Sequence, residues 1–210
     1  MAHPSARPGS RKGLFGGTFD PPHVGHLALA EWAREQLKLD EVLFVPVGRP
    51  PHKRATRLSS AGHRLAMARL ATRGNTAFRV SGLEVEAATP SYTVDTLRRL
   101  RARHPRDRWY LIIGSDSLDE FHTWREPETI LELSTLAVAG RPRCGEEALR
   151  RWGRRREIVS LGNPGLDVSS TMVRSRARAG RSLRYLVPDL VASYIVRHRL
   201  YQAARAGRRS

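Results

Sequence analysis

This 210-residue chain is predicted to fold as an α/β protein with a Rossmann-like, doubly wound parallel sheet and helices on both faces. Short apolar runs alternate with segments whose apolar residues recur every three or four positions, which is typical of βαβ units. The 40% apolar content is that of a globular chain, and the length suits one domain with a sizeable core. We therefore expect a single domain with a small helical part at its C-terminal end.

Strands and helices are expected in alternation along most of the chain. The run 109–113 is a strongly apolar strand that ends at Gly114, and the helix at 93–103 carries Val94, Leu97 and Leu100 on one side. The other strands are expected at 14–15, 42–45, 78–80, 136–139 and 158–159, and the other helices at 24–37, 61–71, from about 170, and across 189–199. These elements place a flexible N-terminal tail at 1–12, one domain at 13–201 with its helical part at about 169–201, and a basic tail at 202–210.

The formal net charge of +17 would attract polyanions such as nucleic acid, anionic lipid or phosphorylated metabolites. Of the 37 basic residues only Lys12, Lys38 and Lys53 are lysines, so 34 are arginines, which indicates a coding bias and mostly solvated charged faces. One cysteine, Cys144, excludes an internal disulfide framework and a cysteine-based zinc cluster. No apolar run approaches the roughly 20 residues that span a bilayer, and 1–12 lacks the apolar core of a signal peptide. We expect a cytoplasmic protein without membrane contact.

Three of the expected strands end in glycine or in loop residues with polar side chains. These ends follow Phe15, Val45 and Ile113. Ligands of parallel α/β sheets bind beyond the carboxyl ends of the strands. The three ends are therefore expected to line one crevice.

The segment 16–26, between the first strand and the first helix, is the most informative stretch. Gly16 and Gly17 let the backbone approach a ligand, with amides free to point at phosphate oxygens. His23 and His26 lie three apart on one face of the helix start, and Gly25 removes a side chain that could block access to them. A helix N-terminus adds a favourable dipole and unpaired amides. Together these features predict a polyphosphate cradle; the alternatives are a plain turn, or a metal pair, which lacks a third ligand.

The whole string Gly16-Gly17-Thr18-Phe19-Asp20-Pro21-Pro22-His23-Val24-Gly25-His26 resembles the signature of the nucleotidyltransferase superfamily with the His-x-Gly-His motif. Within that superfamily the chain is similar to the bacterial nicotinate-nucleotide adenylyltransferases. The resemblance extends from about Gly13 to Tyr201, and four further blocks follow in the same order. They lie at 50–53, 90–93, 112–118 with Trp124, and 168–171 with Arg174 and Arg176.

The resemblance implies transfer of the adenylyl group of ATP to nicotinate mononucleotide, with Mg²⁺ bound mainly through ATP phosphates and no metal ligand from the protein. It implies catalytic roles for His23, His26, Lys53 and Arg174. ATP contacts are implied for Gly16, Gly17, Thr18, Phe19, His26, Gly114, Asp116, Ser169, Ser170, Thr171 and Arg174. Mononucleotide contacts are implied for Gly17, Phe19, Asp20, His23, Lys53, Tyr92, Thr93, Trp124 and Arg125.

Several of these residues have a second interpretation from their position alone. Asp116, directly after an apolar strand, suits a ribose hydroxyl or the N-cap of a helix at Ser117. The hydroxyls at 169–171 suit helix capping as well as phosphate or adenine contacts. Lys53 is either a compact ammonium that follows a migrating phosphate charge or an ordinary solvated lysine.

The tryptophans divide in the same way. Trp124 is either a plate that stacks on a pyridine ring or a core residue, whereas Trp32, Trp109 and Trp152 are interpreted as packing residues. Arg125 follows Trp124 where some relatives place an aromatic or polar residue, and it could attract the pyridine carboxylate.

Two rival functions remain at this point. A phosphopantetheine adenylyltransferase of the same superfamily shares the first and last blocks but not usually the Pro-Ser-Tyr-Thr block. A basic nucleic-acid-binding protein would explain the +17 charge, yet the chain has no recognisable RNA- or DNA-binding module. The expected partners are therefore ATP and nicotinate mononucleotide, without specific nucleic acid, and the sequence leaves open whether the protein forms a homo-oligomer.

Overall fold

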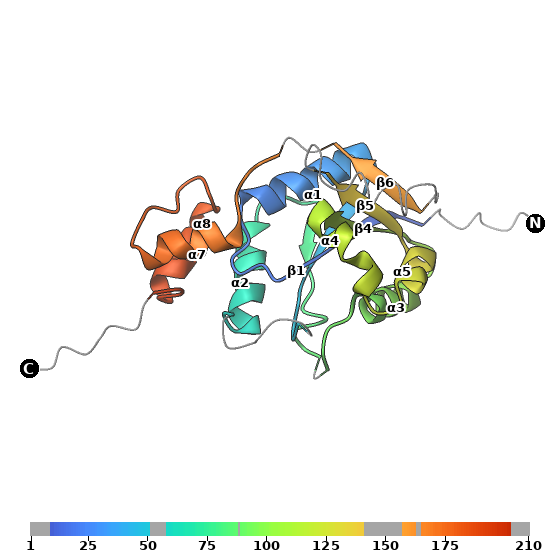
Figure 1. Ribbon diagram of the computed structural model, residues 1–210, viewed down its shortest axis with the longest axis horizontal. Helices are drawn as coiled ribbons and strands as arrows, with labels where there is room; N and C mark the ends of the chain where they lie inside the picture. The colour runs from blue at the N-terminus through green and yellow to red at the C-terminus, as the bar shows by residue number, and fades with distance from the viewer. Residues whose placement is uncertain (1–8, 51–57, 88, 141–156, 163–164, 203–210) are drawn as a thin grey trace, which may run out of the picture.

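The computed structural model describes residues 9–50, 58–87, 89–140, 157–162 and 165–202. Within these ranges six strands form one sheet in the order β3-β2-β1-β4-β5-β6, with every neighbouring pair parallel. The chain winds outward from β1 to β3, returns to β4 beside β1, and winds outward again to β6 (Figure 1), which confirms the predicted doubly wound sheet. The strands are β1 (Arg11–Gly17), β2 (Glu41–Pro46), β3 (Phe78–Val80), β4 (Arg108–Gly114), β5 (Thr135–Ala139) and β6 (Ile158–Leu161).

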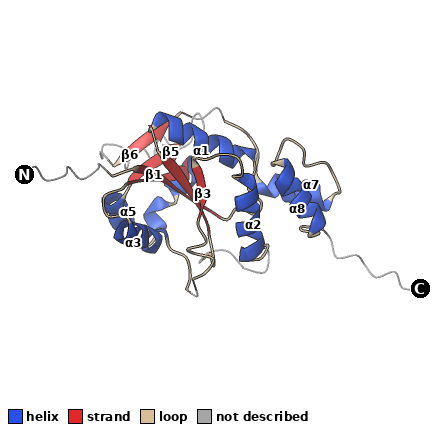
Figure 2. Ribbon diagram, turned by 180° about the vertical axis from the view of Figure 1, so that it is seen from behind, coloured by secondary structure: helices blue, strands red, loops and turns tan. Residues whose placement is uncertain are grey.

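Helices cover both faces of the sheet (Figures 1 and 2). Side chains alternate between the faces of a strand, and along β4 the residues Leu111 and Ile113 join one hydrophobic cluster whereas Ile112 joins another. The first cluster holds apolar residues of the helices at 93–103, 115–119 and 127–133, and the second holds Ala30 and Ala33 of the helix at 24–36. The helices are α1 (Val24–Gln36), α2 (Ala61–Ala71), α3 (Thr93–Arg103), α4 (Ser115–Asp119) and α5 (Pro127–Leu133), with a 3₁₀ turn, η2 (Phe121–Thr123).

The C-terminal part consists of two helices, α7 (Ser170–Arg178) and α8 (Asp189–Arg197), which lie beside α2 at one end of the molecule (Figure 1). A third hydrophobic cluster joins Met67 of α2 to Val173 of α7 and to Val191 and Ile195 of α8. This cluster holds the helical part against the rest of the domain, because these four side chains are at most 2% exposed.

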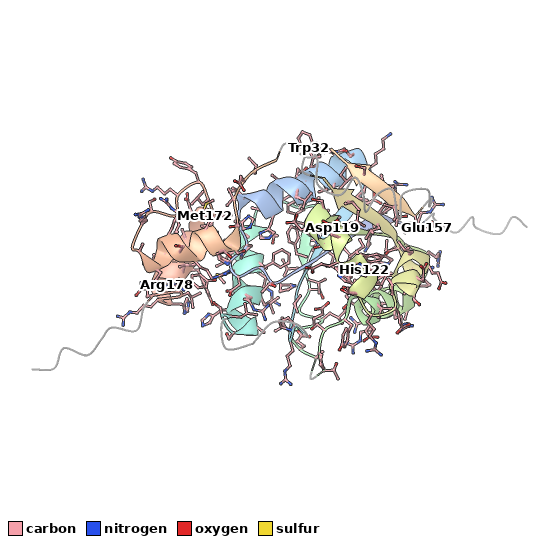
Figure 3. All side chains as sticks on the ribbon, in the orientation of Figure 1. Trp32, Asp119, His122, Glu157, Met172 and Arg178 are labelled. Carbon is pink, nitrogen blue, oxygen red and sulfur yellow. The ribbon has the colours of Figure 1, made fainter. Side chains whose placement is uncertain are left out.

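Three predictions from the sequence, on a strand, a helix and a tryptophan, differ from the structure. β1 begins at Arg11, inside the predicted tail, because Arg11 and Lys12 pair with β4; a polar strand start gives no apolar signal. Helix α5 was not predicted, although Pro127 at its first turn is a typical helix start. Trp32 is 40% exposed on α1 and lies at the periphery (Figure 3), so its interpretation as a packing residue is wrong.

The other tryptophan expectations have mixed outcomes. Trp109 is buried, as predicted, and Trp152 lies outside the described residues, as does Cys144. Across the described part of the chain, no helix is both long and apolar enough to cross a membrane.

Candidate active site

The turn between β1 and α1 lies at the centre of the sheet, where the winding direction reverses. β1 has β2 on one side and β4 on the other, so the three strand ends predicted to share a crevice are neighbours. An added Cβ at Gly16 or Gly114 would meet no atom within 4 Å, which leaves space at the ends of β1 and β4. Ligands of doubly wound sheets bind at such a switch point.

His23 and His26 stack on each other at the start of α1. Their ring centroids are 3.6 Å apart with an angle of 30° between the planes. His23 is the N-cap residue, and its backbone N–H donates to Nδ1 of His26 at 3.1 Å. Because Nδ1 of His26 accepts this bond, its ring proton resides on Nε2, which is thereby a donor.

Burial keeps both imidazoles neutral. It lowers the pKa of His23 to about 4, and burial together with the charge on His23 lowers the pKa of His26 to about 3. Nδ1 of His23 is buried and forms no hydrogen bond within the described residues. At neutral pH the turn therefore presents uncharged N–H donors, with one buried ring nitrogen still without a partner.

Phe19 and Asp20 are placed differently from their predicted substrate contacts. The Phe19 side chain is 1% exposed and packs edge-on against His26 at 5.1 Å, so only its backbone can reach a ligand. Asp20 is also 1% exposed, and both carboxylate oxygens accept bonds from the chain, from Tyr201 Oη at 2.7 Å and from the Ser59 N–H at 3.1 Å. The Asp20 carboxylate therefore has a structural role in this turn, and its predicted contact with the mononucleotide stays a prediction.

Helix α7 brings the last sequence block onto the same turn. Nη1 of Arg174 donates to the carbonyl of Asp20 at 2.8 Å, and Oγ of Ser170 donates to the carbonyl of Pro21 at 2.9 Å. Oγ1 of Thr171 accepts from Nη2 of Arg174 at 3.1 Å. Ser169 caps α7 by accepting the Met172 N–H at 3.2 Å, which confirms the capping interpretation for this hydroxyl.

Asp116 is exposed in the first turn of α4, directly after β4. The helix begins at Ser115 with Gly114 as its N-cap, so the interpretation of Asp116 as an N-cap is wrong. Its carboxylate therefore stays at the carboxyl end of β4, beside the open position at Gly114.

The predicted pyridine-binding residues form a second group around the start of α3. Tyr92 is the N-cap of α3 and Thr93 its first residue, and the Arg125 guanidinium lies over the Tyr92 ring at 4.9 Å. Nη1 of Arg125 also lies 3.5 Å from Asp95 Oδ2. Trp124 is half-buried and packs against Phe121 with ring centroids 5.4 Å apart. Trp124 therefore has a packing contact and a partly open surface.

Lys53 lies outside the described residues, so its predicted role stays a prediction. Two buried charged residues near the site were missed by the sequence analysis. Arg64 is 2% exposed and binds four backbone carbonyls, and Glu84 accepts the Thr96 hydroxyl at 2.6 Å while burial raises its pKa. Neither had a sequence signal, since Arg64 is one arginine among 34 and Glu84 sits in an unremarkable loop.

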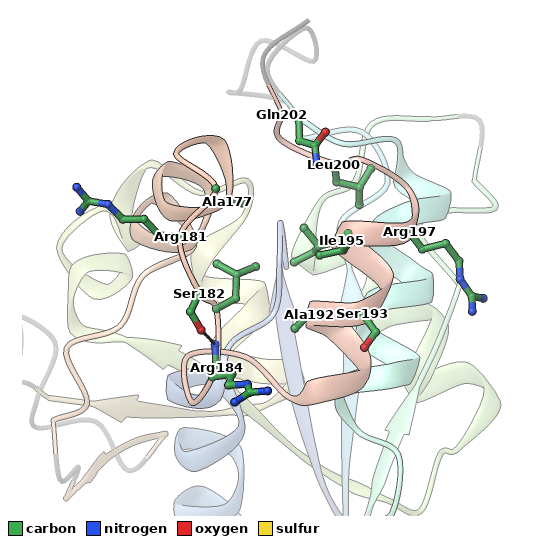
Figure 4. Close-up of a pocket in the computed structure, with 13 residues that line it drawn as sticks. Ala177, Arg181, Ser182, Arg184, Ala192, Ser193, Ile195, Arg197, Leu200 and Gln202 are labelled. Carbon is green, nitrogen blue, oxygen red and sulfur yellow. Dashed lines mark hydrogen bonds between the residues drawn. The ribbon is translucent and has the colours of Figure 1, made fainter. Parts of the chain in front are cut away.

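A separate cavity of about 620 Å³ lies in the C-terminal part, between α7, the segment 180–184 and α8 (Figure 4). Leu183, Ile195 and Leu200 contribute its apolar lining, with Arg181, Arg184 and Arg197 also around it. None of the predicted site residues lines this cavity. This cavity is therefore separate from the site at the β1–α1 turn.

The sequence matches the Cytidylyltransferase-like family over residues 14–176. A curated protein of Salinibacter ruber, named "Probable nicotinate-nucleotide adenylyltransferase", is 48% identical over 191 residues, which cover 90% of this chain and 97% of that protein. One of the same name from Exiguobacterium sibiricum is 46% identical over 189 residues, with coverage of 90% and 97%.

A solved structure of Plasmodium falciparum nicotinic acid mononucleotide adenylyltransferase complexed with NaAD shares the fold. Its TM-score is 0.76 at 19% identity, over 91% of this chain and 97% of that one. The turn geometry, the order of the sequence blocks and the identity to curated relatives agree. This chain belongs to the nicotinate-nucleotide adenylyltransferase family.

Proposed function

We propose that this chain transfers the adenylyl group of ATP to nicotinate mononucleotide, giving nicotinate adenine dinucleotide and pyrophosphate in NAD biosynthesis. The observation that carries the proposal is the stacked, neutral pair His23–His26 at the start of α1, with Arg174 bound to the same turn. Relatives named for this activity at 46% and 48% identity support it.

In the proposed reaction, the 5′-phosphate of the mononucleotide attacks the α-phosphorus of ATP. A new P–O bond forms, the bond from the α-phosphorus to the bridging oxygen breaks, and pyrophosphate leaves with that electron pair. The attacking phosphate is already anionic near neutral pH, so the reaction needs no general base. The protein then acts by positioning and by stabilising charge, as in other phosphoryl-type transfers.

The histidines act as hydrogen-bond donors in this scheme. Nε2–H of His26 is fixed as a donor by the bond at Nδ1, and the stacked His23 ring restricts how far it can turn. Donors that are already oriented when negative charge moves onto pyrophosphate lower the barrier without reorganising. Arg174 and Lys53 supply positive charge to the β- and γ-phosphates.

Substrate contacts are assigned by the same scheme. Backbone amides at 16–19 and the side chains of Asp116 and Arg174 bind ATP. The N-terminal end of α3, with Thr93, holds the pyridine carboxylate, because helix N-termini favour anions. The open side of Trp124 stacks on the pyridine ring.

Mg²⁺ fits this site through the nucleotide. The Asp20 carboxylate of the turn accepts bonds from Tyr201 and Ser59, and the described residues contain no cluster of three histidine, cysteine or acidic side chains. When bound, the ion would neutralise charge on the phosphate oxygens. The cytoplasmic location stays a prediction.

The test is product identification. The protein is mixed with ATP and Mg²⁺ and, in separate reactions, with nicotinate mononucleotide, nicotinamide mononucleotide or phosphopantetheine. Pyrophosphate release is measured and the product is identified by mass spectrometry. We expect nicotinate adenine dinucleotide as the fastest-formed product. Preferential turnover of phosphopantetheine, or no pyrophosphate with any acceptor, would contradict the proposal.

A further inference from the structure

Arg64 is a buried arginine of α2 whose guanidinium touches three separate segments. Nη1 donates to the carbonyl of Thr18 at 3.1 Å and to the carbonyl of Val47. Nη2 donates to the carbonyl of Gly48 at 2.9 Å, and Nε to that of Ser59 at 3.1 Å. All four acceptors are backbone carbonyls, so Arg64 fixes the position of the backbone in these segments.

The segments that Arg64 joins are those that surround the proposed reaction. Thr18 lies in the turn between β1 and His23, and Val47 and Gly48 follow β2 on the way to Lys53. Gly48 is held from both sides, because its N–H donates to Oγ of Ser91 at 3.1 Å, in the block that precedes α3.

Asp20 reinforces the same arrangement. Its carboxylate accepts the Ser59 N–H, while the Ser59 carbonyl accepts from Arg64, so both polar groups of one peptide segment are fixed. The Asp20 charge also favours the protonated form of Arg64 against the burial that lowers its pKa. A guanidinium suits this place because it offers five N–H donors in a rigid plane, whereas a lysine ammonium offers three at one point.

Burying a charge is costly even when it is paired. Four carbonyls satisfied by one planar group fix the spacing between the phosphate-binding turn and the segment after β2. A shift of about 1 Å in such spacing costs roughly 10²-fold in rate.

We propose that Arg64 is a positioning residue for adenylyl transfer: it sets the phosphate-binding turn at a fixed distance from the segment that leads to Lys53. The inference rests on the proposed function for its consequence in catalysis. Its structural part, the fixing of the two segments, stands independently of the reaction.

The test compares Arg64→Met with Arg69→Met, the same substitution at an exposed position of the same helix. We expect kcat of Arg64→Met to fall by roughly 30- to 100-fold, with KM for each substrate within about fivefold of wild type. Arg69→Met should keep wild-type values. A role in stability alone would lower the melting temperature and leave kcat of the folded enzyme unchanged, and a kcat within threefold of wild type would overturn the proposal.

Two further measurements keep the test decisive. If Arg64→Met does not fold, Arg64→Lys replaces it in the test, because lysine keeps the positive charge but not the planar set of N–H donors. Full activity in Arg64→Lys would overturn the proposal. Hydrogen exchange separates this inference from the reaction itself. The Val47 amide donates to the Gly17 carbonyl at 2.9 Å, and the Gly48 amide donates to Ser91 Oγ. Both amides should exchange hydrogen faster in the Arg64 variant than in wild type, and at the wild-type rate in Arg69→Met. Unchanged exchange would refute the fixing of these segments, even if wild type proved to have another substrate.

Discussion

Gly25→Ala tests whether the position of the His23 ring matters to the reaction. A Cβ at position 25 would lie 3.1 Å from Nδ1 and 3.2 Å from Cε1 of His23, closer than ordinary van der Waals contact. The His23 ring is 7% exposed and stacked on His26, so it cannot swing away freely. The ring must therefore move by a few tenths of an ångström toward its neighbour.

The chain offers a matched control in Gly62→Ala. Gly62 is the second residue of α2 as Gly25 is of α1, and the nearest atom to a Cβ there would be Ser60 Oγ at 3.9 Å. Both changes gain helix propensity, up to about 1 kcal/mol. Only Gly25→Ala adds strain, about 1–3 kcal/mol for an overpacked site, so it should be less stable than Gly62→Ala by about that amount.

The displaced ring should also lower the turnover number. If about 1 Å of misplacement costs roughly 10²-fold, a shift of a few tenths of an ångström costs roughly 5- to 10-fold in kcat. Initial rates of pyrophosphate release at saturating substrates and thermal unfolding curves measure the two effects. Equal kcat values for Gly25→Ala and Gly62→Ala would refute the reasoning that the ring position is critical.

Three further predictions follow from single contacts. Folded His23 and His26 take up protons only near pH 4 and pH 3, whereas unfolded histidine does so near pH 6.5. Acid therefore favours the unfolded state, and the free energy of unfolding should fall as the pH drops below about 6.5. The fall should reach up to about 1.4 kcal/mol per pH unit for each histidine. Urea unfolding from pH 7 to pH 5 checks this, and a flat profile would contradict it. Tyr201→Phe removes the bond to Asp20 and should cost about 1–3 kcal/mol, seen as a lower melting temperature; an unchanged one would speak against a structural role for Asp20. Arg125→Ala should lower kcat/KM for the acid mononucleotide roughly 10-fold and that for the amide much less, whereas equal losses would remove Arg125 from acid recognition.

Features with short-range causes were predictable from the sequence. The strand 109–113 is signalled by its apolar run, and the histidine turn by residues within one 11-residue stretch. The βαβ alternation predicts a parallel sheet, and the observed strand order brings the ends of β1, β2 and β4 together. The α7 block could be located by resemblance, but its bonds to the turn at Asp20 and Pro21 required the fold.

Features that depend on distant partners were not predictable. Asp20 reads as a substrate ligand in the motif, yet its carboxylate is occupied by Tyr201, 181 residues away, and by Ser59. Arg64 gave no signal because its function depends on four carbonyls from three segments, and carbonyls are common to every residue. Trp32 shows the reverse case, since this large apolar side chain on a helix is 40% exposed.

In the proposed reaction, the His26 ring is an oriented hydrogen-bond donor to the phosphates. The most direct measurement is the turnover number of His26→Ala with ATP, Mg²⁺ and nicotinate mononucleotide, beside circular dichroism to confirm that the variant is folded. The loss of one oriented donor predicts a fall in kcat of roughly 10²- to 10³-fold. A folded variant that turns over at nearly the wild-type rate would contradict the role of His26 as a donor to the phosphates.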